Sequence, residues 1–263
     1  MDHVRYTEAP ARREEVLARL GAEGYVASAD LAAELGVSEM TIRRDLRQLE
    51  HDGLARRVAG GATLAGSGRA LPFEARAVAE GDEKLAIARA CLPLLAGAAT
   101  VLLDAGTTVA PLAGLIADGT RVVSHSAPVI TGCVARDGIE LTAIGGDYSP
   151  ETRSFAGGMA TQALARVVAD VAVLSATAVD GTGMMCISAP DADIKQAMIE
   201  VARVRILLVD HSKIGERAPI RFGRLDAVDV IVTDAGADPA QLGLLREAGV
   251  EVVTAPVDLE SAS

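Results

Sequence analysis

Seven short apolar runs, most of them followed by a helix-like stretch, occupy residues 100–253 of this chain. Such alternation is typical of a parallel β-sheet that helices cover on both faces, so it constrains most of the chain to an α/β fold. The expected strands are Thr100–Leu103, Arg121–Val123, Leu141–Ile144, Val171–Leu174, Ile206–Val209, Val230–Val232 and Val250–Val253. The helical stretches that follow are residues 107–117, 127–136, 155–168, 191–202 and 239–248.

The residues before about position 66 follow a different pattern, because their apolar side chains recur every three or four positions. The small, glycine-rich residues 59–68 then indicate a turn and a linker. We therefore expect a small helical domain over residues 1–64, a linker over 65–81 and a mostly parallel α/β domain over 82–263. A helix from Asp82 to about Leu95 is expected to open the second domain.

Three helices are expected in the small domain. They span Arg12–Leu20, Ser28–Leu35 and Glu39–Glu50. Because serine side chains accept hydrogen bonds from the first amides of a helix, Ser28 and Ser38 are expected to cap the second and third helices. The turn Gly36-Val37 joins these two into a helix-turn-helix, with glycine supplying the backbone freedom that the turn needs.

The third helix is expected to bury Ile42, Leu46 and Leu49 and to leave its arginines on or beside the opposite face. A DNA major groove admits one α-helix, and arginine can pair with guanine or bind phosphate. A strand over Leu54–Val58 and a glycine tip would form a wing along the DNA backbone. The residues expected to contact DNA are Ser38, Thr41, Arg43, Arg44, Arg47, Arg56, Arg57, Gly60 and Gly61.

The net charge of the chain, -11, would by itself disfavour a nucleic-acid partner. Residues 1–68, however, hold nine arginines against 11 acidic residues, whereas residues 69–263 hold 16 basic against 25 acidic residues. The acidic excess therefore lies mostly in the second domain. A charge run alone would favour a three-helix packing module with solvated arginines, but the cap, turn, arginine helix and basic hairpin together favour DNA. Binding should weaken with salt, because neutralised phosphates release counterions.

Composition excludes several other classes of protein. Half of the residues are hydrophobic, which excludes a disordered chain, and no apolar run reaches the ~18 residues of a membrane helix. The three cysteines have no paired spacing, so neither a disulfide scaffold nor a zinc finger is expected. The polar N-terminus lacks the apolar core of an export signal, which favours a cytoplasmic location.

The segment Asp104-Ala-Gly-Thr-Thr108 follows an expected strand and is expected to open a helix. Helix N-termini offer N–H groups and the positive end of a dipole to anions. Gly106 would let a ligand approach the backbone, while Thr107 and Thr108 add hydroxyl donors. The sequence therefore predicts a phosphate site here, with a structural strand-to-helix turn as the alternative.

Ligands of open parallel sheets bind at the carboxyl ends of the strands, where further candidate residues lie. Lys213 is the candidate countercharge for a phosphate, with a surface ion pair as the alternative. Asp104 and Asp180 could accept sugar hydroxyls, although Asp180 also suits an ordinary loop. Lys195 is four residues after Asp191, so a solvated pair on one helix is its alternative. The remaining candidates at the strand ends are His125, Ser126, Gly145 and Gly146.

Several motifs resemble the DeoR family of bacterial transcription regulators. The run Leu31–Leu46 carries the most specific one, Thr-Ile-Arg-Arg-Asp-Leu, and Arg57–Ala62 matches the wing. Leu103–Thr108, Asp191–Lys195 and Asp210–Gly215 look like the effector domain of that family, which is similar in fold to ribose-5-phosphate isomerase. The resemblance implies a regulator, commonly a repressor, that senses a phosphorylated sugar or a related metabolite.

The chain departs from the family pattern at two positions. Ala59 stands where the family usually has histidine before the two glycines, and His125 stands where it typically has asparagine. Because histidine titrates near neutrality, His125 could alter the sugar preference or make recognition pH-dependent. A metal site from His125, His211 and Asp210 has no supporting ligand spacing, so neither a metal nor a cofactor is expected.

Taken together, these features predict a sequence-specific regulator that binds a double-stranded DNA operator as a homodimer or higher oligomer. The effector would act by binding one arrangement of the DNA-binding domains more tightly than another. Two alternatives remain: a sugar-phosphate isomerase-like enzyme with an accessory DNA-binding head, and an adaptor whose head binds protein. The enzyme is disfavoured because no nucleophile elbow, Ser-His-Asp order or metal motif is present.

Overall fold

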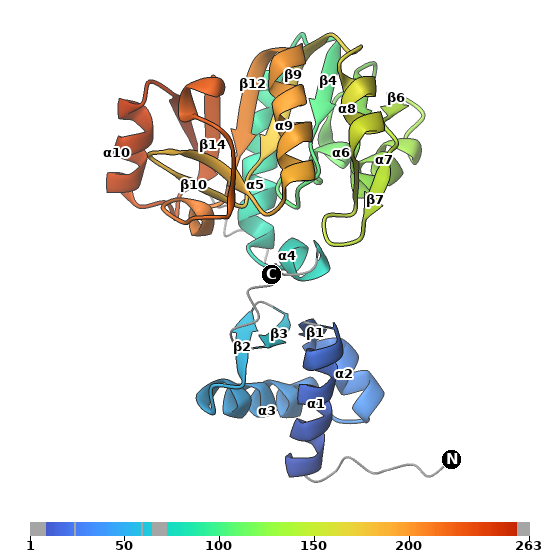
Figure 1. The fold of residues 1–263 in the computed structure, drawn as a ribbon, viewed down its shortest axis with the longest axis vertical. Helices are drawn as coiled ribbons and strands as arrows, with labels where there is room; N and C mark the ends of the chain where they lie inside the picture. Colours follow the sequence, from blue (N-terminus) through green and yellow to red (C-terminus); the bar gives the residue numbers. More distant parts are fainter. Residues whose placement is uncertain (1–8, 24, 59, 65–72, 257–263) are drawn as a thin grey trace. The chain divides into compact units, whose positions relative to one another are not determined.

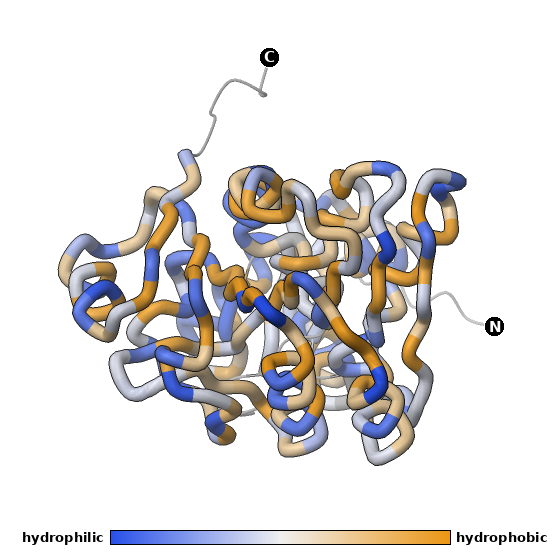
Figure 2. Tube along the Cα trace, turned by 90° about the horizontal axis from the view of Figure 1, so that it is seen from above, coloured by the Kyte–Doolittle hydropathy of each residue, from blue (hydrophilic) through white to orange (hydrophobic). Residues whose placement is uncertain are grey.

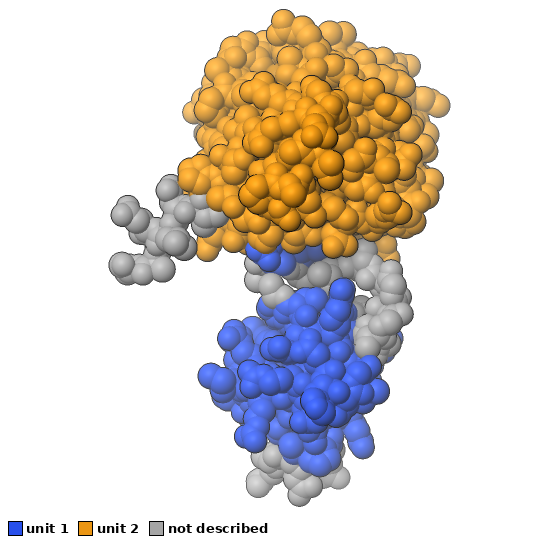
Figure 3. Space-filling model, turned by 90° about the vertical axis from the view of Figure 1, so that its left-hand side faces the viewer, with its two compact units in different colours: residues 1–80 blue, residues 81–263 orange. Residues whose placement is uncertain are grey.

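The computed structural model describes residues 9–23, 25–58, 60–64 and 73–256. The chain divides into two compact units, Met1–Glu80 and Gly81–Ser263, which Figure 3 colours separately. Of the expected linker over 65–81, residues 65–72 lie outside the described part, as does Ala59. Phe73–Val78 form a helix, α4, where only linker was expected.

The first unit contains the expected helices and hairpin, together with a short strand that the sequence did not predict (Figure 1). Its elements before α4 are α1 (Ala9–Glu23), β1 (Tyr25–Ala27), α2 (Ser28–Leu35), α3 (Glu39–His51), β2 (Ala55–Val58) and β3 (Gly61–Leu64). The three strands form an antiparallel sheet in the order β1-β3-β2. The predicted burial of Ile42, Leu46 and Leu49 is confirmed, since each is at most 2% exposed.

The turn and the second cap of the helix-turn-helix are confirmed, but the first cap is wrong. Gly36 adopts a left-handed conformation with φ +65°, and the Ser38 side chain accepts a hydrogen bond from the Thr41 amide. Ser28 caps nothing, because β1 runs directly into α2 and places Ala27 at the N-cap position. Ser28 therefore lies inside the first turn of α2, where it is buried.

The second unit is built on a seven-stranded parallel sheet, which confirms the predicted fold class. All seven predicted strands are present, with ends that shift by up to four residues, the most at the start of the strand predicted over Ile206–Val209. They are β4 (Thr100–Leu103), β5 (Arg121–Ser124), β6 (Glu140–Ala143), β9 (Ala169–Ser175), β12 (Ala202–Leu208), β14 (Val230–Asp234) and β15 (Glu251–Ala255). Their order in the sheet is β15-β14-β12-β9-β4-β5-β6.

Helices cover both faces of this sheet, and α8 and α9 lie in front of it in Figure 1. Because side chains alternate along a strand, Leu102 packs into one core while Val101 and Leu103 pack into the other. Hydrophobic and hydrophilic residues alternate along the covering helices (Figure 2). One face carries α5 (Gly81–Cys91), α6 (Leu112–Leu115) and α7 (Ala127–Val134), and the other α8 (Gly158–Leu164), α9 (Ala189–Val201) and α10 (Pro239–Glu247).

Smaller elements that the sequence did not predict border the sheet, and several of them are only three residues long. A hairpin of β7 (Asp147–Ser149) and β8 (Ser154–Ala156) follows β6. A separate three-stranded antiparallel sheet contains, in this order, β10 (Ala178–Asp180), β11 (Gly183–Cys186) and β13 (Ile220–Gly223). Because β8 occupies its start, the helix expected over 155–168 begins only at Gly158. The 3-10 turns η2 (His211–Lys213) and η3 (Leu225–Ala227) were not predicted either. The turn η1 (Leu92–Leu95) continues α5, so the helix predicted from Asp82 to about Leu95 is present as α5 and η1 together.

The helix expected over residues 107–117 is largely wrong. Successive turns follow β4, and α6 spans only Leu112–Leu115. The amides of Val109 and Ala110 both donate to the carbonyl of Gly106, at 3.1 and 2.8 Å. Pro111 has no N–H group and would break the interior of a longer helix, so the helix begins after it.

The topology brings two strand ends together at the middle of the sheet. The chain proceeds from β4 through β5 to β6 in one direction and from β9 through β12 and β14 to β15 in the other. The neighbours β4 and β9 therefore mark the switch point, where α/β proteins bind their ligands at the carboxyl ends of the strands. Asp104 follows β4, and Ser175 ends β9.

Candidate functional site

The solvent-facing side of α3 carries three of the predicted arginines. Arg43, Arg44 and Arg47 are all exposed, whereas the opposite side of the helix is buried. Arg43 pairs with Glu39 of the same helix at 2.6 Å. In the described part of the chain, the guanidinium groups of Arg44 and Arg47 have no ion-pair partner. Two arginines one turn apart are thus available to a phosphate or a base edge.

The polar residues at the start of α3 are occupied within the helix. The Ser38 hydroxyl lies 2.8 Å from the hydroxyl of Thr41 and accepts the amide of Thr41 at 3.2 Å. This arrangement satisfies one of the otherwise unpaired first amides of the helix. Ser38 and Thr41 therefore hold the beginning of α3 in place, and any DNA contact by them remains a prediction.

The wing is attached to the end of α3. Arg57 donates to the Glu50 carboxylate from its amide at 2.9 Å and from Nε at 2.6 Å. The hydrogen bonds from Arg57 lower the pKa of Glu50. Gly60 adopts a positive φ of +77°, and a side chain on Gly61 would overlap the Val26 carbonyl of β1. The two glycines thus shape the wing, and the exposed Arg56 lies on β2.

One important residue pair of this unit was missed from the sequence. Arg12 of α1 and Asp45 of α3 form an ion pair at 2.5 Å, with both side chains only 6% exposed. The pair fixes α1 against α3, the helix with the exposed arginines. The available signal was a charged residue, Asp45, on the otherwise apolar face with Ile42 and Leu49.

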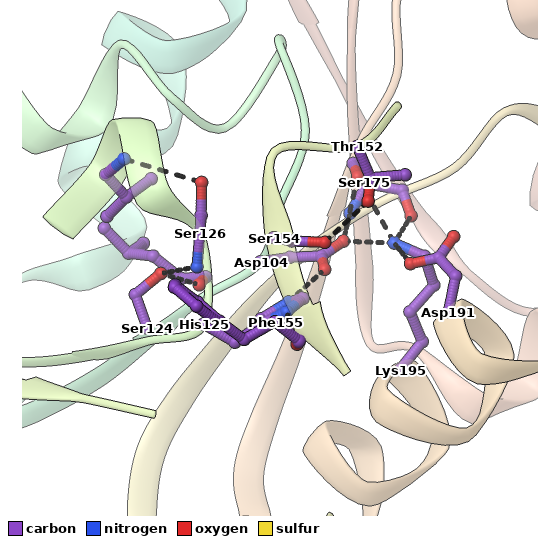
Figure 4. A network of polar contacts seen from close by, with 12 residues as sticks. Asp104, Ser124, His125, Ser126, Thr152, Ser154, Phe155, Ser175, Asp191 and Lys195 are labelled. Carbon is purple, nitrogen blue, oxygen red and sulfur yellow. Dashed lines mark hydrogen bonds and ion pairs between the residues drawn. The ribbon is translucent and has the colours of Figure 1, made fainter. Parts of the chain in front are cut away.

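Asp104 is the centre of a buried polar network at the switch point of the sheet (Figure 4). Its Oδ2 accepts hydrogen bonds from the amide and the hydroxyl of Ser175, both at 2.8 Å, and from the Lys195 ammonium. Its Oδ1 lies 3.1 Å from His125 Nε2. Both oxygens are therefore engaged within the protein, and a sugar hydroxyl would have to replace one of these partners.

Lys195 extends from α9 into this network and is not the solvated partner of Asp191 that the helical spacing allowed. The Lys195 side chain is 2% exposed, lies 3.6 Å from Asp191 Oδ1 and donates to the Ser175 carbonyl at 3.1 Å. Burial acts to lower the pKa of Lys195, but the carboxylates of Asp104 and Asp191 outweigh it and raise that pKa. Burial acts to raise the pKa of Asp104, but Lys195 and His125 hold it below its usual value. The pair is thus an ion pair inside the protein.

His125 faces two acceptors, the Asp104 carboxylate and, through Nδ1 at 2.9 Å, the Phe155 carbonyl of β8. A neutral imidazole has one N–H group, whereas the charged ring can donate to both. Through these two contacts the buried ring, which is 2% exposed, links the switch point to the hairpin β7–β8. In the described residues no group of three or more metal-ligating side chains is present, and His211 binds Asp234 rather than His125.

Lys213 lies beside the turns that follow β4. Its ammonium donates to the Thr108 hydroxyl at 3.2 Å and lies 3.0 Å from Asp210 Oδ2, an ion pair rather than a directed hydrogen bond. Burial acts to raise the pKa of Asp210, but Lys213 and then Ser212 hold it below its usual value. The Lys213 side chain is 20% exposed and can be reached from solvent, whereas the Lys195 side chain is buried.

The turn at Gly106 meets the other half of the switch point. A side chain on Gly106 would overlap Ser175, so glycine is required by this close approach. Across the described residues, no hydrogen bond from the backbone amides of Gly106, Thr107 or Thr108 to a protein acceptor is present. Successive amides in turns form anion-binding concavities. This feature replaces the helix N-terminus as the physical basis for the predicted anion site.

The remaining predicted residues have local partners. Ser126 caps α7 by accepting the Val129 amide at 3.4 Å, and a side chain on Gly146 would overlap the Ala156 carbonyl. Gly145 is exposed nearby. Asp180 accepts the Thr182 amide at 2.8 Å and pairs with Arg217 at 3.2 Å, and among the described residues no contact joins it to Asp104. The structure therefore brings His125, Lys195 and Ser175 together at Asp104, and Lys213 together with Thr108, but not Asp180.

Two protein-family models match this chain. A DeoR-like helix-turn-helix domain matches residues 12–67, and the DeoR C terminal sensor domain matches residues 79–235. The chain belongs to the DeoR family. The resemblance identified from the motifs is thereby confirmed, and in this DeoR-family chain the exposed arginines lie in the helix-turn-helix domain and the Asp104 network in the sensor domain.

Several curated relatives of this chain are named as transcriptional repressors. The chain is 34% identical to the transcriptional repressor AccR of Agrobacterium fabrum over 86% of this chain and 89% of that protein. It is 32% identical to the putative aga operon transcriptional repressor of Escherichia coli O157:H7, over 95% of both. It is 27% identical to the glycerol-3-phosphate regulon repressor of Escherichia coli K12, over 88% and 92%. These relatives favour a regulator over the isomerase-like enzyme.

Among solved structures, the ribose 5-phosphate isomerase A of Methanocaldococcus jannaschii is similar to part of this DeoR-family chain. The match covers 51% of this chain and 55% of that one, at 17% identity and a TM-score of 0.37. The fold class itself rests on the parallel sheet described above. No helix within the described ranges has both the length and the apolar character needed to cross a bilayer.

Proposed function

We propose that this protein is a transcriptional repressor that binds a double-stranded DNA operator through α3 and the wing and is controlled by a phosphorylated sugar or a related metabolite. The observation that carries the proposal is the exposed arginine face of α3 on a helix that is fixed at both ends. Ser38 caps its beginning, Arg57 binds Glu50 near its end, and Asp45 ties its buried side to α1. Such rigidity lets a helix present its side chains to a groove in one geometry.

The effector site is proposed at the turns after β4. The amides of Gly106, Thr107 and Thr108 and the ammonium of Lys213 supply positive partners for a phosphate. The Asp104–Lys195 pair lies behind this loop and orders it through Ser175. One relative is named for the glycerol-3-phosphate regulon and another for the lactose phosphotransferase system, which supports a phosphorylated effector.

The DNA-binding function is expected to show a steep dependence on salt. The intact protein selects duplexes from a random-sequence library, and fluorescence anisotropy then measures its affinity for the selected duplex. The logarithm of the association constant should fall linearly with the logarithm of salt concentration, with a slope of about -0.9 for each phosphate neutralised. We propose that the protein binds DNA as a homodimer or higher homo-oligomer; because helix-turn-helix dimers bind two half-sites about one DNA turn apart, the selected duplex should then contain an inverted repeat. Failure to bind any duplex at low salt would refute the proposal.

The effector site is tested by replacing Lys213 with alanine. A phosphorylated sugar at about 100 times its Kd should stabilise the wild-type protein by about 2.7 kcal/mol, and this stabilisation should disappear in Lys213→Ala. A thermal-shift screen of glycerol 3-phosphate and hexose phosphates measures both values. Arg224→Ala is the matched control, because Arg224 is an 80% exposed cation paired with Asp226 outside this site. An undiminished shift in Lys213→Ala would place the effector elsewhere.

A further inference from the structure

The exposed face of α3 that carries Arg43, Arg44 and Arg47 also carries one apolar side chain that contributes little to folding. Met40 is 74% exposed, although it belongs to the same helix whose Ile42 and Leu46 are at most 1% exposed. Burying a methionine side chain stabilises a protein by about 1.5–3 kcal/mol, so a largely solvated one contributes little of this to folding. Met40 is therefore available for a contact outside the chain.

The position of Met40 places it among the arginines. It precedes Arg43, Arg44 and Arg47 by three, four and seven residues, and these spacings put side chains on one face of a helix. Met40 also lines a groove between α1 and α3 together with Arg13 and Arg44. An apolar group thus lies beside cations that can contact DNA phosphates.

Met40 also lies near the beginning of α3, because it is the second residue of the helix after the Ser38 cap. In helix-turn-helix proteins, the N-terminal residues of the second helix contact base edges, while the first helix crosses the DNA backbone. A base edge in the major groove presents one apolar group, the C5 methyl of thymine. The flexible, polarizable thioether of methionine adapts well to such a small apolar partner.

We infer that Met40 is a specificity-determining residue that reads the methyl group of a thymine in the operator. This inference rests on the proposed DNA-binding function and adds a base preference to it. The arginines supply hydrogen bonds and charge, while Met40 selects thymine at one position of each half-site. Replacing thymine with cytosine or deoxyuridine removes the methyl group that the side chain contacts.

The experiment combines a one-methyl change in the DNA with a change at Met40. In a duplex selected by the intact protein, each thymine is replaced in turn by deoxyuridine, which removes only the methyl group. At one thymine per half-site, the wild type should lose about fourfold in affinity, the size expected for one buried methyl group. Met40→Ala should bind the original duplex more weakly and should lose no further affinity with deoxyuridine at that position.

Met40→Leu provides the matched control, since leucine keeps an apolar side chain at the same place and should retain the sensitivity to deoxyuridine. Leu54→Ala is a second control, because Leu54 is the other large hydrophobic residue that is exposed in the described part of this unit, outside α3. The inference is overturned if Met40→Ala keeps the wild-type deoxyuridine profile at every thymine. If that profile is unchanged while binding stays salt-dependent, only this inference fails; if no duplex is bound at all, the proposed function fails with it.

Discussion

Replacing Lys195 with methionine is expected to lower the free energy of unfolding of the sensor unit by about 3–5 kcal/mol, the typical cost of breaking a buried ion pair on one side. The change leaves the fully buried Asp104 carboxylate without its cation, while the hydrogen bonds from Ser175 remain. Chemical denaturation of the intact protein, followed by circular dichroism, measures the loss. We expect this to be the largest destabilisation from any single side-chain replacement at the switch point.

Two further variants separate the ion pair from general packing. Arg224→Ala removes one cation from an exposed pair and should change stability by less than about 0.5 kcal/mol. Adding Asp104→Leu to Lys195→Met removes the buried carboxylate that has lost its cation, and it should restore part of the lost stability. Equal stability of wild type and Lys195→Met would show that the pair contributes nothing.

The ion pair between Asp104 and Lys195 should also make the protein less stable at strongly acidic pH. Its partners hold the pKa of Asp104 below the value of about 3.9 that an aspartate has in an unfolded chain. The stabilisation is therefore present above that value and is lost as the pH falls through the lower folded pKa. In Lys195→Met this contribution should be smaller, so the variant should lose less stability than the wild type between neutral and strongly acidic pH.

Replacing both Arg44 and Arg47 with alanine is expected to abolish measurable binding to the selected duplex. A single arginine contact to a base or phosphate is worth about 1–3 kcal/mol, which corresponds to roughly 5- to 150-fold in affinity for each residue. Neither guanidinium has an ion-pair partner in the described part of the protein, so the variant should keep its fold. Anisotropy measures the affinity, and the salt slope should become less steep by about one for each phosphate that an arginine no longer neutralises.

Arg43→Ala is the informative comparison, because Arg43 is already paired with Glu39 and should contribute less than Arg44 or Arg47. Far-ultraviolet circular dichroism checks that both the double variant and Arg43→Ala retain their helices. Unchanged operator affinity in the double variant would exclude α3 as the recognition helix. It would instead favour the interpretation of the first unit as a protein-binding head.

Much of the fold could be predicted because its elements produce periodic patterns. The predicted strand Thr100–Leu103 agrees with β4 in both bounds, and the helix expected over Glu39–Glu50 agrees with α3 to within one residue. The hairpin β7–β8 could not be predicted, because three-residue strands are shorter than any detectable alternation. The helix expected over 107–117 is reduced to Leu112–Leu115, because Pro111 lacks the N–H group that a longer helix would need there.

The candidate sites were predictable in part. Arg44 and Arg47 follow from the arginines opposite the apolar face of one helix, a property of local sequence. The main partner of Lys195 does not follow from local sequence, because helical spacing indicates Asp191, four residues away, whereas the hydrogen-bonded carboxylate, Asp104, lies 91 residues away. The sequence placed Asp104 and Lys195 in one candidate effector site but gave no signal that they pair with each other.

By itself, the sequence determined what each stretch of chain can become: a capped arginine helix, a basic hairpin and a parallel sheet with glycine and threonine at a strand end. These features depend on neighbours within a few residues, so their physical causes are all present in a short window. Only the tertiary structure decided which residues share a site. The strand order places β4 beside β9 and buries Asp104, and in a low-dielectric interior its long-range partners, rather than its sequence neighbours, set its charge state and role.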